Sequence, residues 1–346
     1  MIPISNEKSA GEHQMASIDE TVPRRTILAG LALGMTGAGM SGALASSPKL
    51  RRSPVKIASA TENRMTFHTT RVGDVEVFHR EAGPKDAPVI LLLHGFPTSG
   101  HMFRDLMPAL SDQYRVIAPD LPGFGNTVAP RRGEFEYSFD NLAKVIEGFV
   151  DALGLKRYAI YIFDYGAPTG LRLAMRYPER VSAIVTQNGN AYVEGLSDVW
   201  GPFQAYWRDP SPSTREACRQ ALTDDAIKFQ YAHGTPPELL SPDGWMLDQH
   251  YMHRPDAQEI QLDLVLSYRT NVTLYPEFHK YFRAHRPPLL AAWGRNDPFF
   301  IPPGAEAYRK DLPDAEVHFF DTGHFALETH HAEIASLMRM FLAKHR

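Results

Sequence analysis

Short apolar runs recur along the chain and alternate with segments in which apolar residues follow a helical spacing. The clearest run, 88–93, is continuously apolar, which is typical of a strand buried on both faces of a parallel sheet. Further runs predict strands at 75–79, 116–118, 158–163, 181–186, 289–293 and 317–320. Helical spacing predicts helices at 139–153, where Gly154 marks the end, at 170–177 and at 334–342. This alternation predicts an α/β fold with a mostly parallel, doubly wound sheet.

The pattern changes in two places, and these changes predict the domain organisation. From about residue 190 to 286 the chain is rich in aromatic residues and helical in spacing, with several Pro-containing turns. We interpret 191–286 as a helical cap inserted between two parts of one α/β core, 65–190 and 287–346. Residues 46–64 are rich in Ser, Pro, Lys and Arg without apolar periodicity, and are interpreted as a linker.

The first 45 residues resemble a twin-arginine export signal. Arg24 and Arg25 precede a moderately apolar run rich in Gly and Ala, 27–44, which ends in an A-x-A pattern at 43–45. This composition suits a cleavable signal better than a retained anchor helix, which is the alternative. We therefore expect a periplasmic or secreted protein without a stable membrane span after cleavage.

Charge and cysteine content exclude several classes of function. The formal net charge of -4 comes without a basic stripe, so we expect no nucleic-acid partner. Cys218 is the single cysteine, which excludes an intramolecular disulfide and a thiolate metal cluster. We expect Cys218 to be a packed small hydrophobe, and no metal or organic cofactor is implied.

Asp164 stands at an abrupt junction between a predicted strand and a helix. Gly166 and Ala167 are small enough for a tight turn, and a helix start favours negative charge. Such an elbow exposes a nucleophile, although capping of the helix is an alternative role for this aspartate. Asp297 and His324 follow later strands, in the order nucleophile, acid, histidine.

Five motifs in the correct order resemble the epoxide hydrolase and haloalkane dehalogenase branch of the α/β-hydrolase fold. They are HGFP at 94–97, PDLPGFG at 119–125, FDYGA at 163–167, GRNDP at 294–298 and DTGHF at 321–325. The resemblance implies that Asp164 is the nucleophile and that Asp297 orients His324 as general base. It also implies that the backbone N–H groups of Phe96 and Tyr165 form the oxyanion hole.

A carboxylate nucleophile needs no activating base and can displace a leaving group from saturated carbon to give an alkyl ester. His324 would then activate water against that ester. No G-x-S-x-G motif occurs, which argues against a serine esterase. The expected substrate is a small or medium apolar molecule, most simply an epoxide.

The leaving group is expected to meet donors from the cap. Tyr268, in the segment 267–271, resembles the second cap tyrosine of the family, and simple packing is its alternative role. The place of the first cap tyrosine holds Phe203, and Tyr206, one helical turn away, is the substitute candidate.

Haloalkane or haloacetate dehalogenation is the second hypothesis. The Trp and Asn that commonly bind halide are replaced by Tyr165 and Phe96, no His-Trp pair lies near Phe203, and Ile162 occupies a place usually held by a small residue. A third hypothesis assigns no catalysis to the protein: it would be a member of this fold that only binds a ligand.

Overall fold

The computed structural model describes residues 64–345. The predicted export signal, 1–45, lies outside the described residues, as does the predicted linker, 46–64, apart from Arg64. None of the described helices combines the length and the apolar character that a membrane crossing requires.

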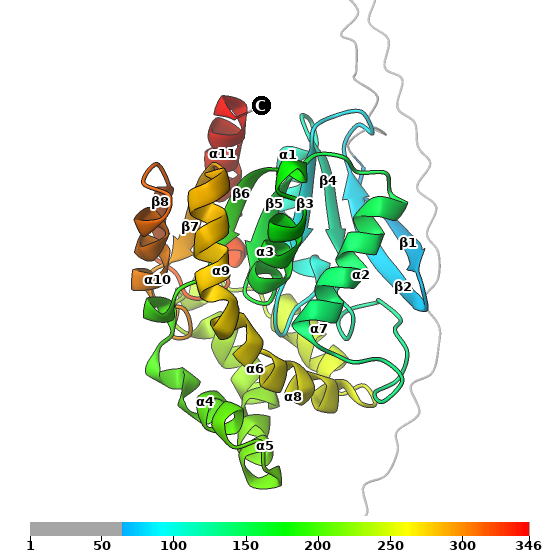
Figure 1. Ribbon diagram of the computed structural model, residues 1–346, viewed down its shortest axis with the longest axis vertical. Coiled ribbons are helices and arrows are strands. Elements are labelled where there is room, and N and C mark those ends of the chain that lie inside the picture. Colours follow the sequence, from blue (N-terminus) through cyan, green and yellow to red (C-terminus); the bar gives the residue numbers. More distant parts are fainter. Residues whose placement is uncertain (1–63, 346) are drawn as a thin grey trace, which may run out of the picture. The chain divides into compact units, whose positions relative to one another are not determined.

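One eight-stranded sheet forms the centre of the described chain, with the strand order β1-β2-β4-β3-β5-β6-β7-β8 (Figure 1). The strands are β1 (Thr66–Val72), β2 (Val75–Ala82), β3 (Val89–Leu93), β4 (Arg115–Pro119), β5 (Tyr158–Phe163), β6 (Val181–Gln187), β7 (Leu289–Gly294) and β8 (Glu316–Phe320). β2 pairs antiparallel with β1 and β4, and all other pairs are parallel. The predicted mostly parallel sheet is confirmed.

Helices cover both faces of this sheet and fill the insertion between β6 and β7. The α-helices are α1 (Leu106–Leu110), α2 (Phe139–Ala152), α3 (Gly166–Arg176), α4 (Gly201–Arg208), α5 (Pro212–Cys218), α6 (Asp224–Ala232), α7 (Asp243–Met252), α8 (Ala257–Ser267), α9 (Arg269–His285), α10 (Pro302–Ala307) and α11 (Leu327–Lys344).

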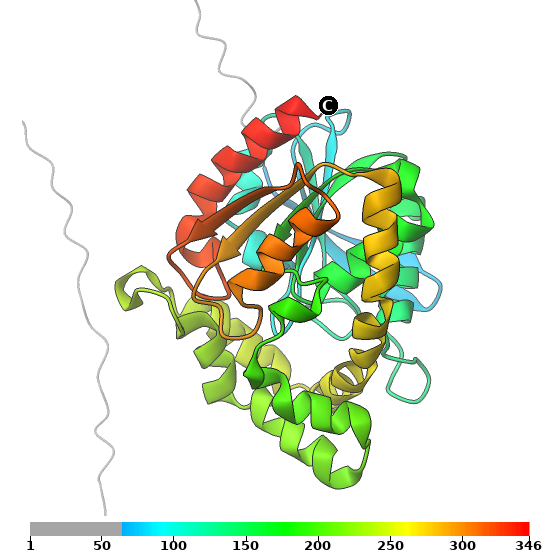
Figure 2. The ribbon, with the colours of Figure 1, turned by 60° about the vertical axis from the view of Figure 1, so that its left-hand side comes forward.

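The continuous apolar runs arise because neighbouring side chains of a strand enter two different cores. In β3, Leu91 and Leu93 pack toward α2, α3, α9 and α10, whereas Ile90 and Leu92 pack toward α1 and α11. Figures 1 and 2 show these helices on the two sides of the sheet. Burial of each such side chain contributes roughly 1.5–3 kcal/mol, so both faces hold the strand in register.

The cap has a small apolar core of its own, beyond one end of the sheet (Figure 1). Its fully buried members are Tyr206, Cys218, Leu222, Ile227, Met252, Leu262 and Val265. Cys218 is a packed hydrophobe, as predicted. The last helix of the insertion, α9, packs Phe278 and Phe282 into the core of the sheet, and α8 adds Ile260 and Leu264 to the same core.

A buried polar cluster joins the cap to the core beside the carboxyl ends of the strands. The Tyr231 hydroxyl on α6 donates a hydrogen bond to Asp248 Oδ2 on α7 at 2.5 Å, and the Tyr231 ring stacks on Phe325 of the core with centroids 3.7 Å apart. The Arg104–Glu328 ion pair of the core is near enough for its charges to affect the pKa of Asp248. Burial raises the pKa of Asp248 to about 7, while the hydrogen bond from Tyr231 opposes this shift.

We predict that Asp248→Asn stabilises the protein at pH 8. Because the folded-state pKa of Asp248 is raised, its stabilising contribution is complete below the unfolded pKa of about 4 and is lost as pH rises through about 7. An amide keeps the acceptor for Tyr231 and cannot ionise. The free energy of unfolding in urea should exceed that of the wild type by roughly 4 kcal/mol at pH 8 and match it near pH 4. Identical pH dependence of the two proteins would contradict this account.

Candidate active site

The turn between β5 and α3 presents Asp164 in a strained backbone conformation. Its φ is 46°, in the left-handed region that non-glycine residues rarely adopt. The turn is tight because Gly166 lies against β3, where an added Cβ would approach the carbonyl oxygen of Leu93 to 2.1 Å. The Asp164 side chain is buried at the carboxyl end of the sheet, as the predicted elbow requires.

Both predicted oxyanion donors reach the Asp164 carboxylate itself. The backbone N–H of Phe96 donates to Asp164 Oδ1 at 2.6 Å, and the backbone N–H of Tyr165 donates to the same carboxyl group. This approach needs a glycine at position 95, since a Cβ there would lie 2.3 Å from Asp164 Oδ1. The HGFP loop and the elbow therefore form one unit around a single carboxylate group.

His324 is held by Asp297, as predicted. Its Nδ1–H donates to Asp297 Oδ2 at 2.7 Å, and both side chains are buried. The backbone N–H of Phe299 donates to Asp297 Oδ1 at 2.7 Å, so the carboxylate is fixed from two sides. With Nδ1 occupied, Nε2 is the nitrogen of His324 that is left to act as a base.

Two further residues support this pair, and the sequence reasoning missed them. Asn188 Nδ2 donates to Asp297 Oδ2 at 2.7 Å, while Asn188 Oδ1 accepts from the backbone N–H of Gly294 at 2.9 Å. Gln187 Nε2 donates to the carbonyl oxygen of His324 at 2.9 Å. Gln187 ends the buried strand β6 and Asn188 follows it. Two polar residues directly after an apolar strand were the signal that could have identified them.

Burial and nearby charges together shift the pKa values of Asp164 and His324. Burial raises the pKa of Asp164 to about 6, although the nearby His324 and the two backbone donors oppose this. Burial alone would lower the pKa of His324, but the charge and hydrogen bond of Asp297, together with the charge of Asp164, raise it above its ordinary value. Asp164 and His324 thus stabilise each other's charged forms.

A small cavity of about 50 Å³ contains both groups. It is lined by Phe96, Asp164, Tyr165, Trp200, Phe203, Ala221, Leu222, Gln230, Val265, Tyr268, Phe299 and His324. Most of these side chains are apolar, so the few polar groups determine how a ligand is oriented. Among residues 64–345, no group of three or more His, Cys, Asp or Glu side chains is placed to hold a metal ion.

Of the two predicted leaving-group donors, the structure brings only Tyr268 to this cavity. Its hydroxyl is buried and near the Tyr275 hydroxyl, but no hydrogen bond of good geometry binds it. Burial raises its pKa well above the usual value, so it remains a phenol. Tyr206 lies in the cap core instead, where its hydroxyl accepts a hydrogen bond from Arg215 Nη1 at 3.0 Å. This placement does not support Tyr206 as a donor. The prediction failed because helical spacing from Phe203 does not specify which face of the helix meets the cavity.

Indole N–H groups near the cavity are already bound to the backbone. Trp200 Nε1 donates to the carbonyl oxygen of Phe299 at 3.1 Å, and Trp207 Nε1 donates to that of Val265 at 2.7 Å. Neither indole is therefore available to bind a halide in this arrangement.

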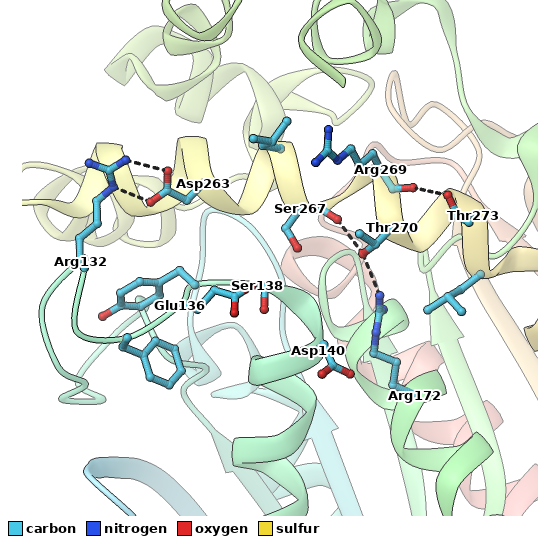
Figure 3. Close-up of a pocket in the computed structure, with 15 residues that line it drawn as sticks. Arg132, Glu136, Ser138, Asp140, Arg172, Asp263, Ser267, Arg269, Thr270 and Thr273 are labelled. Atoms are coloured by element: carbon cyan, nitrogen blue, oxygen red, sulfur yellow. Dashed lines mark hydrogen bonds and ion pairs between the residues drawn. The ribbon is translucent and has the colours of Figure 1, made fainter. Parts of the chain in front are cut away.

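The backbone on either side of Tyr268 is anchored from the outside (Figure 3). Arg172 of α3 donates to Asn271 Oδ1 at 2.7 Å and to Thr270 Oγ1 at 3.0 Å, and Ser267 Oγ accepts from the backbone N–H of Phe139 at 3.1 Å. Arg172, Ser267 and Thr270 border a surface hollow of about 1030 Å³ that contains neither Asp164 nor His324. The junction of α8 and α9, and with it Tyr268, is thus held by the core.

We predict that Asp297→Asn lowers the pKa of His324 below its ordinary value. The substitution removes the charge that outweighs burial, so desolvation then dominates. Nitrogen-15 NMR of histidine-labelled protein, titrated from pH 4 to 9, measures the change. Asp164→Asn is the matched control and should lower the same pKa less. An unchanged pKa in Asp297→Asn would show that Asp297 does not control the charge of the imidazole.

Comparisons with known proteins give a consistent result. A family model described as the alpha/beta hydrolase fold matches residues 88–331. A Saccharomyces cerevisiae protein named an uncharacterized hydrolase is 48% identical over 282 residues, which are 80% of this chain and 97% of that protein. Haloalkane dehalogenase 2 of Mycobacterium tuberculosis is 43% identical over 101 residues, 29% of this chain and 35% of its own length. The crystal structure of haloalkane dehalogenase DbeA from Bradyrhizobium elkani matches with a TM-score of 0.67 and 23% identity, covering 81% of this chain and 100% of that chain.

Proposed function

This chain belongs to the alpha/beta hydrolase fold family, and from that premise we propose that it hydrolyses small epoxides through an ester on Asp164. The observation that carries the proposal is the hydrogen bond from the Phe96 N–H to Asp164 Oδ1. In an enzyme that attacks a substrate carbonyl, these donors await an oxygen of the substrate. Here they hold an oxygen of the protein, so the carbonyl to be attacked by water is that of Asp164.

The first step uses the second oxygen of Asp164. Oδ2 attacks an epoxide carbon, so an ester C–O bond forms while a ring C–O bond breaks and its electron pair stays on the ring oxygen. That oxygen takes the phenol proton of Tyr268, whose hydroxyl has no other hydrogen bond of good geometry. The product is a hydroxyalkyl ester of Asp164.

Water hydrolyses the ester in the second step. Water adds to Cγ of Asp164 as its proton passes to Nε2 of His324, and the Phe96 and Tyr165 N–H groups stabilise the oxyanion that forms. Collapse breaks the ester bond, and the departing alkoxide takes the proton back from His324. The carboxylic acid left on Asp164 then ionises, and its proton restores the Tyr268 phenol.

Epoxide opening fits the donors of the cavity better than halide release. An alkoxide needs a group that can give a proton, and Tyr268 is a buried phenol without a hydrogen bond of good geometry. Dehalogenation is the second candidate because relatives that match part of the chain are named haloalkane dehalogenases. The occupied indole N–H groups of Trp200 and Trp207 argue against it.

We predict that His324→Gln accumulates the ester. Without the base, attack by Asp164 proceeds but hydrolysis slows by about 10²–10⁴-fold. Intact-mass spectrometry after exposure to 1,2-epoxybutane should show one adduct with the mass of the epoxide, on the peptide that contains Asp164. The double variant Asp164→Asn, His324→Gln is the control and should stay unmodified. An adduct that persists in the control, or none with any epoxide, would remove Asp164 from the mechanism.

We predict an acid limit of kcat/KM near pH 6. Attack requires the carboxylate, and burial raises the pKa of Asp164 to about 6, so activity should rise with pH through that value. The Tyr268 phenol imposes no loss below about pH 10, because burial raises its pKa further. Initial rates from pH 4 to 10 test both statements. A midpoint near pH 4 would mean that the free nucleophile is solvated rather than buried.

A further inference from the structure

Gln230 is a polar side chain on the buried face of a cap helix. It lies on α6 with Ile227 and Tyr231, at the spacing that places three residues on one face. The Gln230 side chain is 5% exposed and borders the cavity that contains Asp164 and His324. Such a position would ordinarily hold an apolar residue.

The amide of Gln230 has no hydrogen-bond partner in the part of the chain that the structure describes. No hydrogen bond joins the Gln230 side chain to another residue among positions 64–345. Its amide atoms keep some accessible surface where Gln230 lines the cavity, so a polar atom of a ligand can hydrogen-bond to them in place of water. The proposed mechanism assigns roles to Asp164, His324 and Tyr268, and leaves Gln230 unused.

Packing on both sides fixes the turn of α6 that carries Gln230. The next residue, Tyr231, is bound to Asp248 through its hydroxyl and stacked on Phe325 through its ring. Phe325 directly follows His324 in the chain. The amide is therefore held in a constant relation to the catalytic histidine, as recognition of a substrate group requires.

We propose that Gln230 selects the substrate by hydrogen-bonding a hydroxyl, carbonyl or amide group carried beside the epoxide ring. This inference rests on the proposed function. The cavity of about 50 Å³ has room for roughly three to five water molecules, which favours substrates of about five or six non-hydrogen atoms. Substituted epoxides of the glycidol type combine that size with the required polar group.

Glycidol and 1,2-epoxybutane test the proposal because they differ only in a terminal hydroxyl in place of a methyl group. The measured quantity is the ratio of kcat/KM for glycidol to that for 1,2-epoxybutane. Gln230→Met keeps the length of the side chain but removes its hydrogen bonds, and should lower this ratio about tenfold. Gln261→Met is the matched control, because Gln261 is also a buried cap glutamine but does not border the cavity, and it should leave the ratio unchanged.

An unchanged ratio in Gln230→Met, or an equal change in both variants, would overturn the proposal while leaving epoxide hydrolysis intact. A binding experiment separates this failure from failure of the proposed function. In Asp164→Asn, which lacks the nucleophile, glycidol should shift the side-chain NH₂ resonances of Gln230 and 1,2-epoxybutane should not. If the wild type hydrolyses neither epoxide, a glycidol-induced shift of the Gln230 resonances still supports recognition of a polar ligand by Gln230. If glycidol causes no such shift, the proposal for Gln230 is overturned.

Discussion

The hydrogen bond between the Phe96 N–H and Asp164 Oδ1 is the interaction on which the rest of the site depends. It requires a left-handed residue at position 164 and no side chain at positions 95 and 166, where a Cβ would collide with the carboxylate or with β3. A strained residue of this kind costs about 1–3 kcal/mol, and burial of a carboxylate costs several more. The two apolar cores on the faces of the sheet offset these free-energy costs. They also fix β3 and β5 side by side, which holds the Phe96 N–H next to Asp164. The stable part of the fold thereby supports an unfavourable carboxylate where a ligand can reach it.

The same arrangement explains how one histidine can serve the second step. In the free protein the charges of Asp297 and Asp164 both raise the pKa of His324. Formation of an ester on Asp164 removes the smaller of these two charge interactions, so the pKa of His324 falls at the stage where a base is needed. Asn188 and the Phe299 N–H hold the two oxygens of Asp297, and these amide donors do not ionise during the reaction. The change in charge of Asp164 on ester formation thus adjusts His324 for the second step, and the proposed mechanism needs no movement of the triad.

Sequence reasoning identified most of the sheet because strands buried on both faces are continuously apolar, as in β3 and β5. It gave no indication of β1, an edge strand whose side chains are mostly exposed and therefore show no apolar pattern. The structure brings Asp164, Asp297 and His324 together, which could be expected because each follows a strand, and the carboxyl ends of parallel strands meet at one edge. The cap was harder to predict. Tyr206, Tyr268 and Gln230 all occupy buried helical faces, and helical spacing does not distinguish a face that meets the cavity from one that meets the cap core.

The oxygen atom that water contributes provides the most direct test of an ester on Asp164. Excess enzyme should be given one turnover of an epoxide in water labelled with oxygen-18, and both the diol and the peptide containing Asp164 should be analysed by mass spectrometry. The account predicts one labelled oxygen in Asp164 and none in the diol, because water attacks the carbonyl carbon of the protein. Label in the diol with an unlabelled Asp164 would mean that water attacks the epoxide directly, and would contradict the role assigned to the carboxylate.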